Sequence, residues 1–244
     1  MKKFFFLIIA LALCTGNANA LENEPEEGLT WMGLFGMNLS KLQNHGYNTK
    51  AGAMMGIRAD YMLPGAHGAY VTTGLDWTMK GGKISHLVSV GNEQVQVMDA
   101  TSKYNLHYFE IPVRVGYRYN ATEDLGLYGE IGPYFSVGVG GRHKMHIDGD
   151  GTAVRETEDE NTYKAFKNSY DFERGKYSFQ RWDAGIAFRV GAEFNDHYNL
   201  MFGCDWGLAD IYRNSLRDAY FTKYGERLPK VHNFNFSITA GYRF

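Results

Sequence analysis

The sequence predicts an all-β fold: an eight-stranded antiparallel up-and-down transmembrane β-barrel with short periplasmic turns and long extracellular loops. Three observations predict it. Apolar and polar residues alternate with period two in eight segments. The links between these segments are alternately short and long. The chain has 29 glycines in 244 residues, well above the roughly 7% of ordinary globular proteins.

The first twenty residues have the pattern of a cleaved secretory signal peptide. Lys2 and Lys3 precede an apolar run at 4–13, and residues 18–20 form a small-x-small cleavage site. The apolar run is shorter than the ~20 residues of a membrane-spanning helix. We expect a signal peptide at 1–20, a short acidic periplasmic segment at 21–28 and the barrel at 29–244. Cys14 would leave with the signal, so Cys204 would be the only cysteine and no intrachain disulfide would form.

The alternating segments give the expected strands in chain order. The clearest is the last, in which every second residue from Phe234 to Phe244 is apolar and the intervening residues are small or polar. Several segments are long enough for the ~9–11 residues that a tilted strand needs to cross a bilayer. Pro112 and Pro133 fall inside expected strands, so we expect β-bulges there. The expected strands are 29–39, 51–63, 69–80, 104–119, 125–140, 179–194, 198–211 and 232–244.

The links between the strands carry the second half of the prediction. Short turns are expected at 63–68, 120–124 and 195–197, and long polar links at about 40–50, 81–103, 141–178 and 212–231. An outer-membrane barrel has this layout, with both termini in the periplasm. A soluble β-sandwich gives no reason for the alternation of short and long links.

The residues of the polar faces indicate which face is inside. A soluble barrel would bury its apolar face, whereas a membrane barrel turns that face to lipid and encloses the polar one. Seven acidic and six basic residues alternate with the apolar positions, and opposite charges can pair across a narrow lumen. We expect a lumen polar network of Arg58, Asp60, Asp76, Lys80, Glu110, Arg114, Arg118, Glu130, Asp183, Arg189, Glu193, Asp205 and Arg243.

Aromatic residues cluster at one end of the expected strands, on the apolar face. Trp and Tyr collect where a bilayer meets water, although aromatic residues also favour strands in general. The clustering predicts a periplasmic aromatic girdle of Trp31, Tyr61, Tyr117, Tyr119, Phe194, Tyr198, Tyr242 and Phe244.

Several short motifs occur in a characteristic order along the chain. Residues 36–40 read Gly-Met-Asn-Leu-Ser, 80–81 Lys-Gly, 108–112 Tyr-Phe-Glu-Ile-Pro, 132–134 Gly-Pro-Tyr and 241–244 Gly-Tyr-Arg-Phe. Together they resemble the PorT-like outer-membrane β-barrel proteins of Bacteroidetes. The resemblance implies a small eight-stranded barrel of the OmpX type in a Gram-negative outer membrane. It also implies recognition of the terminal aromatic residue by the barrel-assembly machinery, while a role in type IX secretion belongs to PorT itself.

The third long link holds the residues most similar to a metal site. His143, His146, Asp148 and Asp150 are close in sequence, and 148–152 is similar to the start of a calcium-binding loop. Such a loop has Gly at its sixth position and Glu at its twelfth, where this chain has Ala153 and Asp159. We therefore expect a solvated loop, with no metal and no cofactor.

Small outer-membrane barrels can also be lipid A modifying enzymes, which would need a nucleophile and a base near the extracellular rim. His86 or His107 could pair with Ser85 or Ser89 for this purpose. No motif supports the pair, so no catalytic residue is assigned. His45, His67, His197 and His232 are expected in polar links or turns.

Two further features bear on function. Eight strands leave an interior just wide enough for side chains, which argues against an open channel. The link at 213–230 has five basic and two acidic residues, so it could contact lipopolysaccharide phosphates or simply be solvated.

We therefore expect a non-enzymatic outer-membrane protein whose loops serve binding or envelope support. A component of a secretion apparatus and a lipid A enzyme are the alternatives. Expected partners are outer-membrane lipid and lipopolysaccharide, the assembly machinery, and an envelope or secretion protein. The near balance of 25 basic and 27 acidic residues gives no indication of a nucleic acid partner.

Overall fold

The computed structural model describes residues 28–43, 46–90, 96–148, 165–168, 170, 172 and 177–244. At 86–90, 96–100 and 145–148 it describes the backbone alone. The expected signal peptide lies outside the described residues. The described chain forms strands β1 (Gly28–Gln43), β2 (Lys50–Met62), β3 (Ala69–Val90), β4 (Gln96–Asn120), β5 (Leu125–Asp148), β6 (Trp182–Phe194), β7 (Tyr198–Gly207) and β8 (His232–Arg243), and helix α2 (Asn214–Tyr224).

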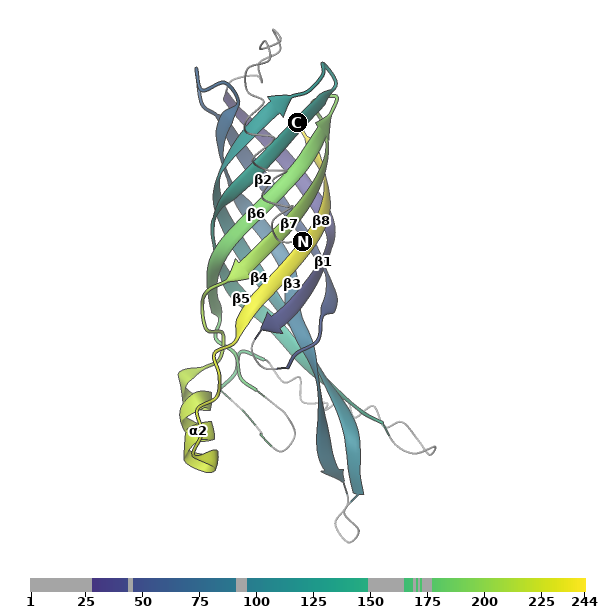
Figure 1. Ribbon diagram of the computed structural model, residues 1–244, viewed down its shortest axis with the longest axis vertical. Coiled ribbons are helices and arrows are strands. Elements are labelled where there is room, and N and C mark those ends of the chain that lie inside the picture. Colours follow the sequence, from purple (N-terminus) through teal and green to yellow (C-terminus); the bar gives the residue numbers. More distant parts are fainter. Residues whose placement is uncertain are drawn as a thin grey trace, which may run out of the picture.

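The strands form a closed antiparallel barrel in which every strand pairs with its neighbours in sequence (Figure 1). Closure is made by β1 and β8, which pair from Met32↔Arg243 to Gln43↔His232. A closed ring leaves no strand edge unpaired. The expected all-β, eight-stranded, up-and-down fold is confirmed.

The two ends of the barrel differ in their connections. Tight turns at 63–68, 121–124 and 195–197 join strands at one end, which we call the turn end. His67, Asn195 and Asp196 adopt positive φ angles of 48°, 48° and 58° in these turns. At the other end, the loop end, the β3–β4 hairpin and α2 project beyond the barrel (Figure 1). Among the described residues, no helix is long and apolar enough to cross a bilayer.

Strand alternation sorts the side chains into an inner and an outer set. Along β2, for example, Met54, Arg58 and Asp60 are buried, whereas Met55 and Ile57 are exposed. The apolar residues of the alternation therefore lie on the outside of the barrel, and the charged residues lie inside it.

Several expected boundaries were wrong. The link expected at 81–103 is mostly strand, because β3 and β4 stay paired out to Val90↔Gln96. The third link is also shorter than expected, since β5 reaches Asp148. β6 begins three residues later than expected and β7 ends four residues earlier. Beyond the barrel both faces of a strand are polar or mixed, so the alternation that marks a strand is lost there.

The bulges expected at the two prolines do not occur. Pro112 pairs with Tyr134 and Pro133 with Ile186 without a change of register. In an antiparallel sheet each residue directs its N–H toward only one neighbouring strand, so a proline removes one bond and need not shift the register. The register shift between β4 and β5 lies instead at His107/Tyr108.

Candidate functional site

The interior of the barrel contains all of the charged residues that the sequence assigns to the lumen. Each of these thirteen residues is at most 7% exposed. They come from seven strands, β2 to β8, and face one another because each lies on the inner phase of its strand. The structure thus brings the expected network together around one axis.

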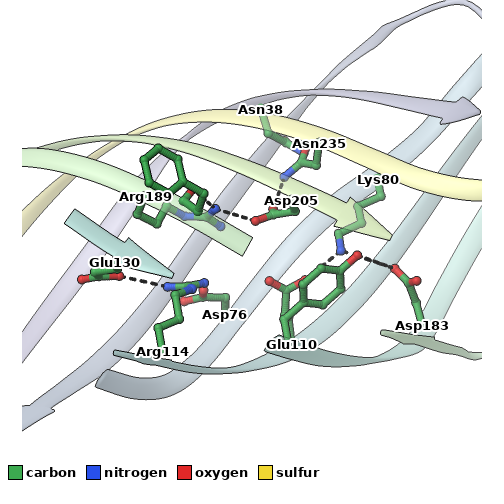
Figure 2. Close-up of polar contacts among 12 residues, drawn as sticks. Asn38, Asp76, Lys80, Glu110, Arg114, Glu130, Asp183, Arg189, Asp205 and Asn235 are labelled. Atoms are coloured by element: carbon green, nitrogen blue, oxygen red, sulfur yellow. Dashed lines mark hydrogen bonds and ion pairs between the residues drawn. The ribbon is translucent and has the colours of Figure 1, made fainter. Parts of the chain in front are cut away.

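The middle of the lumen holds two groups of ion pairs. Arg58 contacts Asp76 at 2.9 Å and Glu130 at 3.6 Å, and Arg114 contacts Glu130 at 3.3 Å. Arg189 pairs with Asp205 at 2.5 Å on the neighbouring strand. Figure 2 shows Arg114 directed toward Glu130 and Arg189 directed toward Asp205. Glycine makes room for them: a Cβ at residue 203 would lie 2.5 Å from Nε of Arg189.

Charged groups are also paired toward each end of the lumen. At the turn end, Arg243 binds Glu193 at 2.7 Å and Asp60 at 3.0 Å. At the loop end, Lys80 contacts Glu110 at 2.7 Å and Asp183 at 3.5 Å (Figure 2). Burying a charge is costly unless it is paired, and this pairing from end to end meets that requirement.

Sequence reasoning missed the tyrosines of the lumen. Tyr70 donates a hydrogen bond to Glu130 at 2.9 Å, and the ring of Tyr134 lies 4.3 Å from the Lys80 ammonium. Tyr108 and Tyr128 are buried as well. All four lie at inward-facing positions of their strands, as the charged residues do. Their place in the alternation is the sequence signal that could have identified them.

The side chains of the lumen network occupy the interior of the barrel and are almost completely buried. An open channel would expose lumen side chains to water along its length, whereas these residues are almost completely buried. The arrangement can stabilise a rigid barrel and hold its loop end in a fixed geometry.

The residues of the expected girdle all lie on the outer surface at the turn end, and each is exposed. Tyr198, Tyr242 and Phe244 form one group of edge-to-face rings, with centroids 5.6 and 5.4 Å apart. His197 stacks on Tyr242 at 5.4 Å. A band of exposed aliphatic side chains continues from this girdle toward the loop end.

A second group of aromatic residues ends that band on the loop side, and the sequence analysis did not identify it. Trp182 and Trp206 are exposed on β6 and β7, and Trp77 stacks on His107 with centroids 5.5 Å apart. Trp77 pairs with Phe109 in register. The outer face therefore has aromatic residues at both borders of an apolar band, as expected of a bilayer-spanning barrel.

A hydrophobic cluster closes the loop end of the barrel. Its residues come from the end of β1, the link before β2, the middle of β4, the link before β6, and α2 with the links on both sides of it. Residues far apart in sequence therefore share one core. We call this cluster the aromatic cap. It consists of Leu42, Tyr47, Tyr104, Leu106, Tyr108, Ala165, Phe166, Phe179, Ile211, Tyr212, Leu216, Leu228 and Val231.

Polar contacts fix the cap in place. The hydroxyls of Tyr47 and Tyr212 lie 2.9 Å apart, and burial raises the pKa of both phenols well above its usual value. Arg213 donates to the carbonyl oxygens of Phe166 at 2.5 Å and Phe179 at 3.2 Å. Both tyrosines therefore stay neutral. The contacts of Arg213 hold the described residues around Phe166 and Phe179 against the link before α2.

One cavity opens beside the cap, with a volume of about 380 Å³. It lies between the start of β6 and the beginning of α2, and a volume of this size is within the range of small-ligand sites. Trp182 is 70% exposed at its edge. The lining residues are Gln180, Arg181, Trp182, Arg213, Asn214 and Ser215, which offer two guanidinium groups and an indole.

The catalytic pair considered from the sequence is not assembled in the described part. Ser85 contacts Thr101 at 3.3 Å, and His107 pairs in register with Met79. Met79 and Ser85 are six residues apart along β3, which is about 20 Å at ~3.3 Å per residue. Ser85 and His107 therefore lie too far apart to act as a pair. The side chains of His86 and Ser89 lie outside the described residues.

The other candidate residues have structural contacts where they are described. His143 stacks on Tyr104 with centroids 4.7 Å apart, whereas the side chains of His146 and Asp148, and all of Asp150 and Asp159, lie outside the described residues. His197 and His232 contact the carbonyl oxygens of Arg243 and Ala209 through Nδ1. The described residues contain no group of three or more His, Cys, Asp or Glu that could hold a metal ion.

Known proteins and one family model show similarity to this chain. Similar solved structures include Ail, the attachment invasion locus protein of Yersinia pestis, at 15% identity over 90% of this chain and 100% of that chain, with a TM-score of 0.39. Neisserial surface protein A matches at 11% identity over 89% and 100%, with a TM-score of 0.44. OprG from Pseudomonas aeruginosa matches at 13% over 90% and 97%, with a TM-score of 0.40. No curated protein matches the sequence significantly. Residues 17–213 match the outer membrane protein beta-barrel domain family, and the chain belongs to this family of Gram-negative outer-membrane proteins.

Proposed function

We propose that the protein is a non-enzymatic outer-membrane barrel that holds a folded binding platform at the cell surface. The turn end lies in the periplasm in this proposal, and the loop end faces outward. The observation that carries it is the aromatic cap, in which Tyr47, Phe166 and Tyr212 pack three separate links onto one rigid barrel. Binding residues are commonly placed on loops that a rigid scaffold positions.

The filled lumen favours a binding platform and argues against a channel. Lys80, Glu110 and Asp183 close the interior just below the cap. The cavity lined by Arg181, Trp182 and Arg213 gives the platform one place where a ligand could be held. The proposed surroundings are outer-membrane lipid and lipopolysaccharide, with the assembly machinery engaged during biogenesis through the terminal Phe244.

Two measurements test the proposal. Purified protein in planar lipid bilayers should give no discrete conductance steps, and regular steps would contradict a filled lumen. Pull-downs from solubilised outer membranes should recover partners with the wild-type protein and lose them with Tyr212→Ala, which loosens the cap. Stable recovery of secretion subunits with both proteins would favour the second candidate, an accessory role in secretion, to which the PorT-like motifs point.

A further inference from the structure

The cavity beside the aromatic cap opens on the outer surface of the barrel. Its volume is about 380 Å³, and its walls come from the residues at the start of β6 and at the start of α2. Trp182, the first residue of β6, lines it, lies on the outer phase of its strand and is 70% exposed. A ligand in this cavity would therefore contact the outside of the barrel.

Two guanidinium groups line the cavity, and neither forms an ion pair with a described carboxylate. Arg181 donates to the carbonyl oxygen of Gly138 at 3.0 Å, and its guanidinium carbon lies 5.8 Å from the centroid of the Phe166 ring. Arg213 donates to the carbonyl oxygens of Phe166 and Phe179. A guanidinium has five N–H donors and stays charged. Both groups therefore have donors and a positive charge left for a ligand.

The described acidic residues nearest in sequence to the cavity residues have partners or positions elsewhere. Asp183 is buried on the inner phase of β6 and lies 3.5 Å from the Lys80 ammonium in the lumen. Asp210 pairs with Arg217. Asp218 is the only acidic residue of α2 and belongs to its second turn, beyond the residues that line the cavity. The lining itself contains two positive side chains and no negative one.

The first turn of α2 adds backbone donors to the two guanidinium groups. Asn214 and Ser215 are the first residues of this helix, and both line the cavity. No side chain caps the helix start, and its first turn has no acidic residue. The first N–H groups of a helix have no acceptor within the helix, and the helix dipole favours an anion there. The cavity thus combines three sources of positive potential at one place.

The height of the cavity along the barrel indicates where an anion would come from. Trp182 and Trp206 belong to the aromatic residues that border the apolar band on the loop side. Indole rings at such a border lie at the level of the lipid headgroups. Arg181 directly precedes Trp182, and consecutive Cα atoms are about 3.8 Å apart. The positive groups of the cavity therefore begin at the height of lipid phosphates.

We propose that this cavity binds the phosphate monoester of a lipid headgroup in the leaflet at the loop end. Arg181, Arg213 and the first amides of α2 would contact the phosphate oxygens, and the Trp182 ring would pack on the apolar part of the same lipid. A phosphate monoester has three free acceptor oxygens and a charge between −1 and −2 at neutral pH, so it can use several donors at once. The inference rests on the proposed function, to whose binding platform it assigns a ligand.

The test measures lipid binding to the purified full chain in detergent by native mass spectrometry. The probe is phosphatidic acid, a phosphate monoester, and the comparison lipid is phosphatidylglycerol with the same acyl chains, a phosphate diester. Glycerol 3-phosphate serves as the soluble competitor. The test variants are Arg181→Gln, which removes one guanidinium, and Asn214→Asp, which places a carboxylate at the helix start. Arg227→Gln, at an exposed position outside the cavity, is the matched control because all three variants change the net charge by −1.

The wild type and Arg227→Gln should bind phosphatidic acid equally, and both should bind phosphatidylglycerol more weakly. Arg181→Gln and Asn214→Asp should each lose about tenfold in affinity for phosphatidic acid, since one charge-assisted hydrogen bond is worth roughly a factor of ten. Binding of phosphatidic acid by either variant as tightly as by Arg227→Gln would overturn the site. Equal binding of the two lipids by the wild type would overturn the monoester. Displacement of the lipid by glycerol 3-phosphate at the same concentration would overturn the lipid source.

Folding and orientation are checked separately from binding. An acidic residue in the first turn stabilises a helix, so Asn214→Asp should weaken binding without loosening α2. Every variant should keep the gel mobility of the unheated wild type. A loop end found in the periplasm would contradict the proposed function without changing binding in detergent. Failure of the wild type to prefer phosphatidic acid, with the loop end at the cell surface, would contradict only this site.

Discussion

Lys80 and Glu110 form an ion pair of 2.7 Å inside the barrel, with Asp183 3.5 Å from the same ammonium group. We predict that Lys80→Met destabilises the barrel by about 3–5 kcal/mol, because two buried carboxylates lose their cation. Urea unfolding in lipid vesicles, followed by tryptophan fluorescence, measures the loss. The double variant Lys80→Met/Glu110→Gln should recover part of it. A loss no larger than that of Lys230→Met, at an exposed site, would contradict the pairing.

Gly116 and Tyr70 give a second prediction about the lumen. A Cβ at residue 116 would lie 2.4 Å from Cζ of Tyr70, whereas a Cβ at residue 140 would meet nothing within 4 Å. We predict that Gly116→Ala costs about 1–3 kcal/mol through overpacking. Gly140→Ala should be neutral or slightly stabilising. Equal unfolding midpoints for the two variants would mean that the Tyr70 ring does not fill the space beside Gly116.

Exposed apolar residues give a prediction that distinguishes residues facing lipid from residues facing water. Ile131 on β5 and Phe221 on α2 are similarly exposed, at 53% and 51%. We predict that Ile131→Arg destabilises the folded protein in vesicles by about 2–4 kcal/mol, since an arginine at mid-bilayer depth is costly on a lipid-facing strand. Phe221→Arg should change stability by less than about 1 kcal/mol, as at an ordinary surface position. Equal effects would place both residues in water.

The paired hydroxyls of Tyr47 and Tyr212 predict an alkaline limit for the cap. Burial raises the pKa of both phenols above the ordinary value of 10.0. The folded cap therefore holds protons that the unfolded chain releases, so its stability is fully present below pH 10.0 and falls as the pH rises above it. Limited proteolysis of the loops between pH 9 and 12 should accelerate above about pH 10. Tyr47→Phe/Tyr212→Phe should flatten this dependence, and an unchanged profile would contradict it.

Much of the barrel could be predicted from the sequence because burial there repeats every second residue. Strands such as β2 and β8 lie within one or two residues of their expected bounds. The charges on the inner phase could be assigned for the same reason. Their partners could not, since Arg243 on β8 meets Asp60 on β2 only after the ring closes.

The loop end could not be predicted in the same way. Helix α2 begins without a side-chain cap and without an acidic residue in its first turn, so the usual signals of a helix start are absent. Gly225 in the left-handed conformation ends the helix, and Gly225 and Lys223 in the last turn are the local signals of that end. The aromatic cap draws Tyr47, Phe166 and Tyr212 from three distant links. No periodicity within a single segment reports such contacts.

The most direct test of the central claim combines gel mobility with surface proteolysis in the native host. The account predicts that unheated protein from detergent-extracted outer membranes runs faster than heated protein, as a closed barrel does. It also predicts that protease added to intact cells cleaves only in the links at the loop end. A protein with no heat-dependent shift, or cleavage at the turns 63–68, 121–124 or 195–197 in intact cells, would contradict a membrane barrel that presents its loop end at the cell surface.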